Sequence, residues 1–95
     1  MNKNEARTIL AEHLALYRTR SYAELAASTE AQKTETLEVR GPTGIPYQIE
    51  FNFFWDNKPK GDVRVCGSID DGGWRAYVPL ASSFIISASG NFVGE

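Results

Sequence analysis

Between residues 45 and 55, every second side chain is apolar. The six apolar residues of this alternation are Ile45, Tyr47, Ile49, Phe51, Phe53 and Trp55. A period of two predicts a long β-strand with one buried face, because a helix would scatter these residues around its circumference. Phe54 is the exception, an aromatic residue among the polar positions.

The N-terminal part of the chain has a different period. Apolar residues recur at steps of three and four from Asn4 to Arg20, which predicts an amphipathic helix. Ser21 followed by Glu24 is a capping-box pattern, so we expect a bend near Arg20-Ser21 and a short second helix through about Ala27. One continuous helix is the alternative. The polar stretch 28–33 predicts a linker.

Turn signals arrange further strands beside the long one. Gly41-Pro42-Thr43-Gly44 predicts a hairpin with Thr34–Arg40, and the loop 56–62 leads into Val63–Ile69. Asp71-Gly72 is typical of a two-residue hairpin, which would join Val63–Ile69 to Trp74–Val78. Two more strands are expected around Phe84-Ile85-Ile86 and Phe92-Val93.

The turns and the alternation agree on one register. Opposing Trp55 and Val63 brings Phe51 to Gly67, and the Asp-Gly turn sets Ile69 against Trp74, so apolar positions share one face. A slip by one residue would destroy that agreement. The chain is therefore expected to be one α+β domain, 1–95, with a helical arm (1–28) packed on one face of a five- or six-stranded antiparallel meander (34–95).

Composition and charge argue against some classes of function, namely nucleic-acid binding and membrane association. The 95 residues are 42% hydrophobic and 23% charged, which is ordinary for a globular domain. A net charge of -2 gives no electrostatic footprint for nucleic acid or an anionic membrane. The chain lacks a secretory leader pattern and an apolar run long enough for a membrane span, so a cytoplasmic location is expected.

The register also defines a second sheet face, on which the candidate binding residues lie. They are Glu50, Asn52, Phe54, Arg64, Ser68, Arg75 and Tyr77. Two aromatic residues on an otherwise polar face are typical of a contact surface. The leading hypothesis is therefore a non-enzymatic module that binds a protein partner or forms a homodimer. Phe54 stacked under Arg64, with Glu50 and Arg75 simply complementing each other on a solvated face, is the alternative.

Two other functions stay open. A small ligand would bind between helix and sheet in a pocket lined by aromatics such as Tyr47, Phe51 and Trp74. An enzyme would use the row Glu50, Ser68 and Arg75, and its test is a perturbed Glu50 in a cleft.

Other candidate chemistry is weaker. The single cysteine, Cys66, precludes an intramolecular disulfide, and the register places it on the opposite sheet face from His13, which argues against a Cys-His nucleophile. No metal site or cofactor is expected, and Asp70-Asp71-Gly72-Gly73 indicates a turn rather than a cation loop.

The run Gly61–Arg75, followed by Pro79-Leu80 and Phe84–Ile86, resembles small bacterial proteins of uncharacterised function. This resemblance covers about the C-terminal half of the chain. It implies a similar α+β domain and no particular activity.

Overall fold

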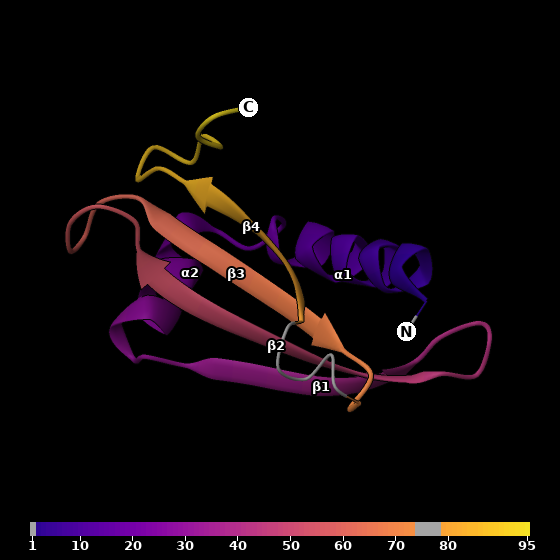
Figure 1. The fold of residues 1–95 in the computed structure, drawn as a ribbon. Coiled ribbons are helices and arrows are strands. Elements are labelled where there is room, and N and C mark those ends of the chain that lie inside the picture. Colours follow the sequence, from indigo (N-terminus) through magenta and orange to yellow (C-terminus); the bar gives the residue numbers. More distant parts are fainter. Residues whose placement is uncertain (1, 74–78) are drawn as a thin grey trace.

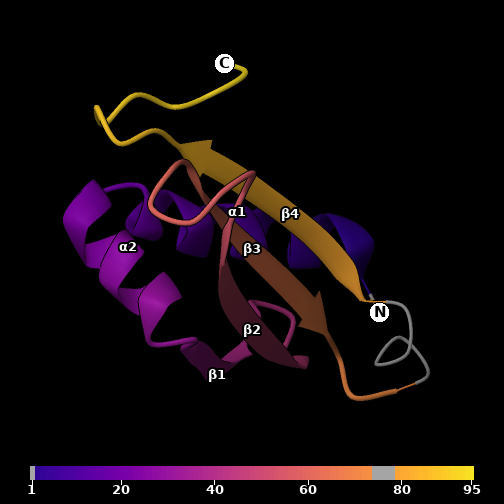
Figure 2. The same ribbon diagram turned by 90° about the vertical axis from the view of Figure 1, so that its left-hand side faces the viewer.

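Two helices and four strands follow one another along the chain (Figure 1). The computed structural model describes residues 2–73 and 79–95. The elements are α1 (Lys3–Tyr17), α2 (Tyr22–Glu30), β1 (Thr34–Arg40), β2 (Pro46–Trp55), β3 (Val63–Asp70) and β4 (Leu80–Ile86). The strands form an antiparallel sheet in the order β1-β2-β3-β4, and both helices lie on the same side of it (Figure 2). The expected α+β class is confirmed.

Side-chain caps explain why the helical arm is two helices. The Asn2 side chain accepts a hydrogen bond from the Glu5 amide (3.0 Å) and begins α1. Ser21 Oγ accepts one from the Glu24 amide (3.1 Å) and begins α2, so the bend expected at Arg20-Ser21 is confirmed. The second helix runs on to Glu30, and the linker expected at 28–33 is therefore wrong over its first half.

The extension of α2 has a packing cause. Ser28 and Thr29 are buried, and Thr29 Oγ1 donates to the Leu25 carbonyl (2.8 Å), which satisfies the hydroxyl inside the helix. Because these polar residues do not continue the apolar periodicity, the sequence pattern predicted a helix that ends too early.

The predicted pairing of the three central segments is confirmed. Trp55 lies opposite Val63 and Phe51 opposite Gly67 in β2 and β3. A Cβ at Gly67 would lie 2.8 Å from the Phe51 ring and 2.9 Å from Leu10 Cδ1, so glycine lets the ring and α1 close over the strand. On the other side of β2, Leu37 of β1 faces Ile49 as expected.

The outer neighbour of β3 differs from the expected one. It is β4, which places Leu80 opposite Ile69, Ser82 opposite Gly67 and Phe84 opposite Val65. The strand expected at Trp74–Val78 lies outside the described residues. Since β2 occupies one edge of β3 and β4 the other, the expected pairing of Val63–Ile69 with Trp74–Val78 was wrong, whereas its pairing with β2 is confirmed.

The strand count is also smaller than expected. The described residues form four strands, not five or six, and Phe92 contributes only an isolated bridge to Ile86. The Asp-Gly hairpin signal is local, whereas pairing with β4 brings Phe84 and Ile86 into the core, where they are 5% and 4% exposed. Burial of two large apolar side chains outweighs a turn preference.

The core lies between the helices and the sheet. α1 packs against β3 and β4, and α2 packs against β2 and β3. The buried hydrophobic residues are Ala6, Ile9, Leu10, Leu14, Tyr17, Leu25, Tyr47, Ile49, Phe51, Phe53, Val63, Val65, Ile69, Phe84 and Ile86. The opposite face of the sheet has no helix against it among the described elements (Figures 1 and 2).

Candidate functional site

The open sheet face carries the predicted site residues that the structure describes. We use this name for the outward side chains of β2, β3 and β4, together with those of β1. Three cross-strand pairs fix its centre, Glu50 with Ser68, Asn52 with Cys66 and Phe54 with Arg64. The structure thus brings together Glu50, Asn52, Phe54, Arg64 and Ser68, as the register predicted. Arg75 and Tyr77 lie outside the described residues.

The third member of each row comes from β4. Ala81 lies opposite Ser68, Ser83 opposite Cys66 and Ile85 opposite Arg64. The predicted catalytic row Glu50, Ser68, Arg75 therefore has an alanine in the place expected for its arginine. A methyl group supplies neither charge nor hydrogen bonds, so this row has no third functional group at that position.

Phe54 is the large apolar side chain of this face. It is 52% exposed, whereas its strand neighbour Phe53 is 4% exposed. The alternative, Phe54 stacked under Arg64, is not among the cation–π contacts of the described residues. Arg64 Nε donates to Asp56 Oδ1 (3.0 Å) and Nη1 donates to Ser83 Oγ (3.2 Å). Arg64 is thereby neutralised by Asp56, and the Phe54 ring stays available to a partner.

The acidic residues of the face are held by amides. Gln48 Nε2 donates to Glu38 Oε2 (2.9 Å), and Asn52 Nδ2 donates to Glu50 Oε1 (3.3 Å). Both carboxylates are exposed, and neither forms an ion pair with a described residue. The centre of the face therefore carries negative charge that its described neighbours do not cancel.

Cys66 and His13 are separated by the sheet, as predicted. Cys66 alternates with the inward Val65 and Gly67, so its half-buried thiol projects from the open sheet face. Burial raises the pKa of this thiol, and the charge of Arg64 opposes that effect only partly. His13 lies on α1, with its Nδ1 2.9 Å from the Ile9 carbonyl oxygen.

The aromatic pocket of the alternative ligand-binding hypothesis is filled at its two described residues. Tyr47 and Phe51 are both 0% exposed and belong to the core, and Trp74 lies outside the described residues. The Tyr17 ring packs on Phe51 with 4.4 Å between centroids. The space that a ligand would need is occupied by the protein's own side chains.

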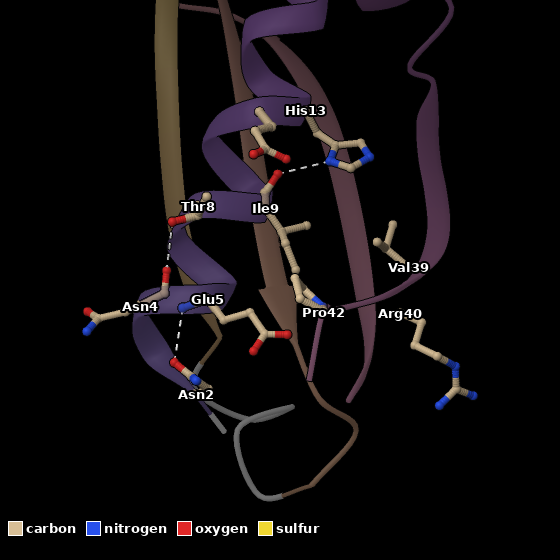
Figure 3. Close-up of a pocket in the computed structure, with 10 residues that line it drawn as sticks. Asn2, Asn4, Glu5, Thr8, Ile9, His13, Val39, Arg40 and Pro42 are labelled. Carbon is tan, nitrogen blue, oxygen red and sulfur yellow. Dashed lines mark hydrogen bonds between the residues drawn. The ribbon is translucent and has the colours of Figure 1, made fainter. Parts of the chain in front are cut away.

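A groove opens instead between the N-terminal half of α1 and the β1–β2 hairpin (Figure 3). Its volume is about 580 Å³. The lining residues that matter here are Glu5, Ile9, Glu12, His13, Val39, Arg40 and Pro42. We call it the α1 groove. The sequence pattern does not reveal this groove, because the groove depends on where α1 lies relative to the hairpin, and strand register does not determine that position.

One end of the α1 groove is built around Glu5. Thr43 Oγ1 donates to Glu5 Oε2 (2.6 Å) and ties the hairpin turn to the first turn of α1. The second oxygen, Oε1, is buried without a hydrogen-bond partner among the described residues. It packs against Gly41, where any Cβ would collide with it. A side chain at position 41 would force the end of the Glu5 side chain to move, a contact that the turn position of Gly41 alone did not reveal.

A second missed cluster joins the helices to β1. Tyr17 Oη donates to Glu35 Oε1 (2.5 Å), and both terminal nitrogens of Arg20 donate to the same carboxylate (3.2 and 3.3 Å). Arg20 and then Tyr17 lower the pKa of Glu35. Burial first, and then Glu35, raises the pKa of Tyr17 to about 12. The sequence pattern gave no partner for Glu35, and only the fold reveals Tyr17 and Arg20 beside it.

The chain was compared with family models, curated proteins and solved structures, and none of them matches it. Within residues 2–73 and 79–95, no three or more His, Cys, Asp or Glu side chains converge as a metal site would require. Neither described helix has the length and apolar character needed to cross a membrane.

Proposed function

We propose that the protein is a binding module that holds a partner protein on its open sheet face, with Phe54 as the central apolar contact. The single observation that supports this most is the 52% exposure of Phe54 on a strand face where the preceding outward residues, Glu50 and Asn52, are charged or polar. Large aromatic side chains with exposed rings are typical of interface centres, because they bury much area with little loss of rotamer freedom.

The surroundings of Phe54 have the form of a small interface. Ile85 is half-buried at the far end of the same row, so Arg64 lies between two apolar side chains, Phe54 and Ile85. On the other side, a hollow of about 350 Å³ adjoins Phe54 and is lined by Trp55, Asn52 and the segment 32–34, among others. A partner side chain entering this hollow would contact the Phe54 ring on its edge.

Charge favours a different protein over a second copy of this chain. Glu38 and Glu50 are unpaired by cations among the described residues, and Arg64 is already paired with Asp56 (2.8 Å). If two copies of this face met, acidic residues would therefore lie against acidic residues. Among the described residues, the centre of the face has no unpaired arginine that would offset the repulsion. A partner with lysine or arginine around an apolar side chain would complement both features.

Site-specific cross-linking tests the proposal. A photoreactive phenylalanine analogue is placed at position 54 and, as a matched control, at Leu16, which is 64% exposed on α1. In the native cell, we expect position 54 to cross-link one discrete protein and position 16 to give none. The purified partner should then bind the unlabelled protein, and Phe54→Ser or Glu50→Lys should weaken binding about tenfold or more, whereas Leu16→Ser should not.

Three outcomes would contradict the proposal. A cross-link only to a second copy of the chain would make the face a homodimer interface. Equal cross-linking from positions 54 and 16 would show that the surface has no specificity. Undiminished affinity in both Phe54→Ser and Glu50→Lys would place the binding surface elsewhere.

A further inference from the structure

The outer edge of β1 carries backbone groups that the β1–β2 ladder does not use. The Gly41 amide donates to the Ile45 carbonyl (2.8 Å), so these two residues form a hydrogen-bonded pair of that ladder. In an antiparallel ladder such pairs recur at every second residue, so the odd-numbered residues of β1 bond to β2. The even-numbered residues therefore direct their amides and carbonyls away from β2, and they are Thr34, Thr36, Glu38 and Arg40.

This edge is accessible and regular. β1 is the first strand in the sheet order, and no described strand lies on its other side (Figure 1). Its even-numbered residues are exposed, and outside the ladder none of them has a backbone partner among the described residues. The inward carboxylate of Glu35 is already bonded to Tyr17 and Arg20. Because β1 has neither a bulge nor a proline, two common devices that blunt sheet edges, it is open to pairing with a further strand.

The hollow beside Phe54 lies where β1 has ended. Thr34, the first residue of β1, lies opposite Asn52, and Phe54 lies two residues further along β2. The place next to Phe54 at this edge is therefore taken by the hollow, which Gln32 and Lys33 line from the connection between α2 and β1. A strand that pairs with β1 and continues past Thr34 would bring an outward side chain to this hollow.

Charge indicates which side chains such a strand carries. Glu50 lies opposite Thr36, and Glu38 is the next outward residue of β1. Neither carboxylate forms an ion pair with a described residue. A lysine or arginine opposite Thr36 would lie two strand spacings from Glu50, roughly 10 Å, which the two side chains span together. A second copy of β1 paired over its full length would instead set its own Glu38 opposite Thr36, beside Glu50, and like charges there are unfavourable.

We infer that the partner of the open sheet face binds through an extended segment that pairs antiparallel with β1. The segment carries a lysine or arginine opposite Thr36 and, four residues later, a large apolar side chain that enters the hollow beside Phe54. Main-chain hydrogen bonds to the even-numbered residues of β1 supply affinity, and these two side chains supply specificity. The inference rests on the proposed function, because it names the part of the partner that reaches Phe54.

The test uses a synthetic peptide, Thr-Lys-Val-Arg-Thr-Thr-Val-Leu-Thr, capped at both ends, whose arginine is opposite Thr36 in this register. Amide hydrogen exchange of the intact protein is followed by NMR with and without saturating peptide. We expect exchange at the even-numbered residues of β1 to slow about tenfold or more. Exchange at Leu37 and Val39 should change little, because their amides already bond to β2.

Two variants of the peptide separate strand pairing from non-specific adhesion. N-methylation of its fourth residue removes an amide that faces β1, whereas N-methylation of its fifth residue removes one that faces away. The first change should weaken binding about tenfold or more, and the second should weaken it much less. In the protein, Thr36→Pro removes the outward donor of the same pair and should act like the first change, whereas Thr36→Val keeps the donor and should not. Circular dichroism confirms that both protein variants are folded.

Equal affinity of the two N-methylated peptides would overturn the inference, as would the absence of saturable binding or of slowed exchange at the even-numbered residues. Protection of these amides in the free protein that increases with its concentration would show that a second copy occupies the edge, which also contradicts it. Failure of the proposed function looks different. A partner captured from position 54 whose binding is lost in Phe54→Ser but unaffected by Thr36→Pro would contradict strand pairing alone, whereas capture of no partner from position 54 would contradict the proposed function.

Discussion

Three phenylalanines of β2 lie within four residues of one another and have opposite surroundings. Phe51 and Phe53 face the helices and are 0% and 4% exposed, whereas Phe54 faces the other way and is 52% exposed. The same side chain thus stabilises the fold on one face of the sheet and remains available for contact on the other. Composition alone therefore does not distinguish a buried aromatic residue from an exposed one, whereas strand register does.

The largest expected effect on stability distinguishes the face of the sheet that the helices cover, here called the covered face, from the open sheet face. Phe51→Ala should lower the free energy of unfolding by about 3–5 kcal/mol, because it removes a buried ring and leaves a cavity. Phe54→Ala should lower it by less than about 0.5 kcal/mol, since the ring is half in solvent. Equilibrium urea denaturation of both variants measures the difference. Similar losses in the two variants would mean that Phe54 is a structural residue.

Gly67 offers a second, smaller test of the covered face. Gly67→Ala should cost about 1–3 kcal/mol, because its Cβ would lie 2.8 Å from the Phe51 ring and 2.9 Å from Leu10. The matched substitution on the open face is Ser68→Ala, which should stay within about 0.5 kcal/mol of the wild type. Thermal unfolding of the two neighbours compares them directly. A stable Gly67→Ala protein would show that α1 does not close as tightly on β3 as described.

Glu35 of β1 forms an ion pair with Arg20 at the covered face. Glu35→Gln should cost about 1–2 kcal/mol near neutral pH, a range that allows for partial solvent screening of the pair with Arg20. Because folding lowers the Glu35 pKa, its stabilising effect is present above the usual carboxylate range and is lost as the pH falls through the folded value. The variant should therefore lose less stability than the wild type when denaturation is followed from neutral to acidic pH.

Tyr17 reports on the same cluster at alkaline pH. Folding raises its pKa from 10.0 to about 12, so its contribution is present below pH 10 and is lost as the pH rises through 12. In Glu35→Gln, the Tyr17 pKa should fall towards 10 but stay above it, because burial is the larger cause. Absorbance of the phenolate measures this shift. An unchanged Tyr17 titration would contradict the hydrogen bond to Glu35.

The smallest effect concerns the C-terminal segment. Arg18 lies over the Phe92 ring, 3.9 Å from its centroid, and donates to both carboxylate oxygens of Glu95 (2.7 and 2.5 Å). Arg18→Gln should cost about 0.5–1 kcal/mol, because these contacts are largely exposed. Hydrogen exchange should show faster opening around Val93, whose amide donates to the Ile85 carbonyl, and no change in β2.

The sequence predicted the open sheet face better than it predicted the sheet edge. Alternation in β2 and the loop to β3 determine the pairs Glu50 with Ser68 and Phe54 with Arg64, because a one-residue slip would bury polar side chains. The neighbour of β3 was mistaken, because an Asp-Gly pair is a local turn signal and the competing gain, burial of Phe84 and Ile86, is visible only once the core is assembled.

Other features depended on contacts distant in sequence. Glu5 meets Thr43 only because the first turn of α1 lies at the β1–β2 turn. Glu35 meets Tyr17 and Arg20 only because the end of α1 and the connection to α2 lie beside β1. Helical periodicity shows which face of α1 is apolar, but it does not show which strand that face covers. The α1 groove follows from this placement and could not be derived from any local pattern.

The most direct test of the account measures stability and binding together in Phe54→Ser. With the partner identified by cross-linking at position 54, we expect a free energy of unfolding within about 0.5 kcal/mol of the wild type and a dissociation constant about tenfold higher or more. Unchanged affinity in a variant that is as stable as the wild type would contradict it.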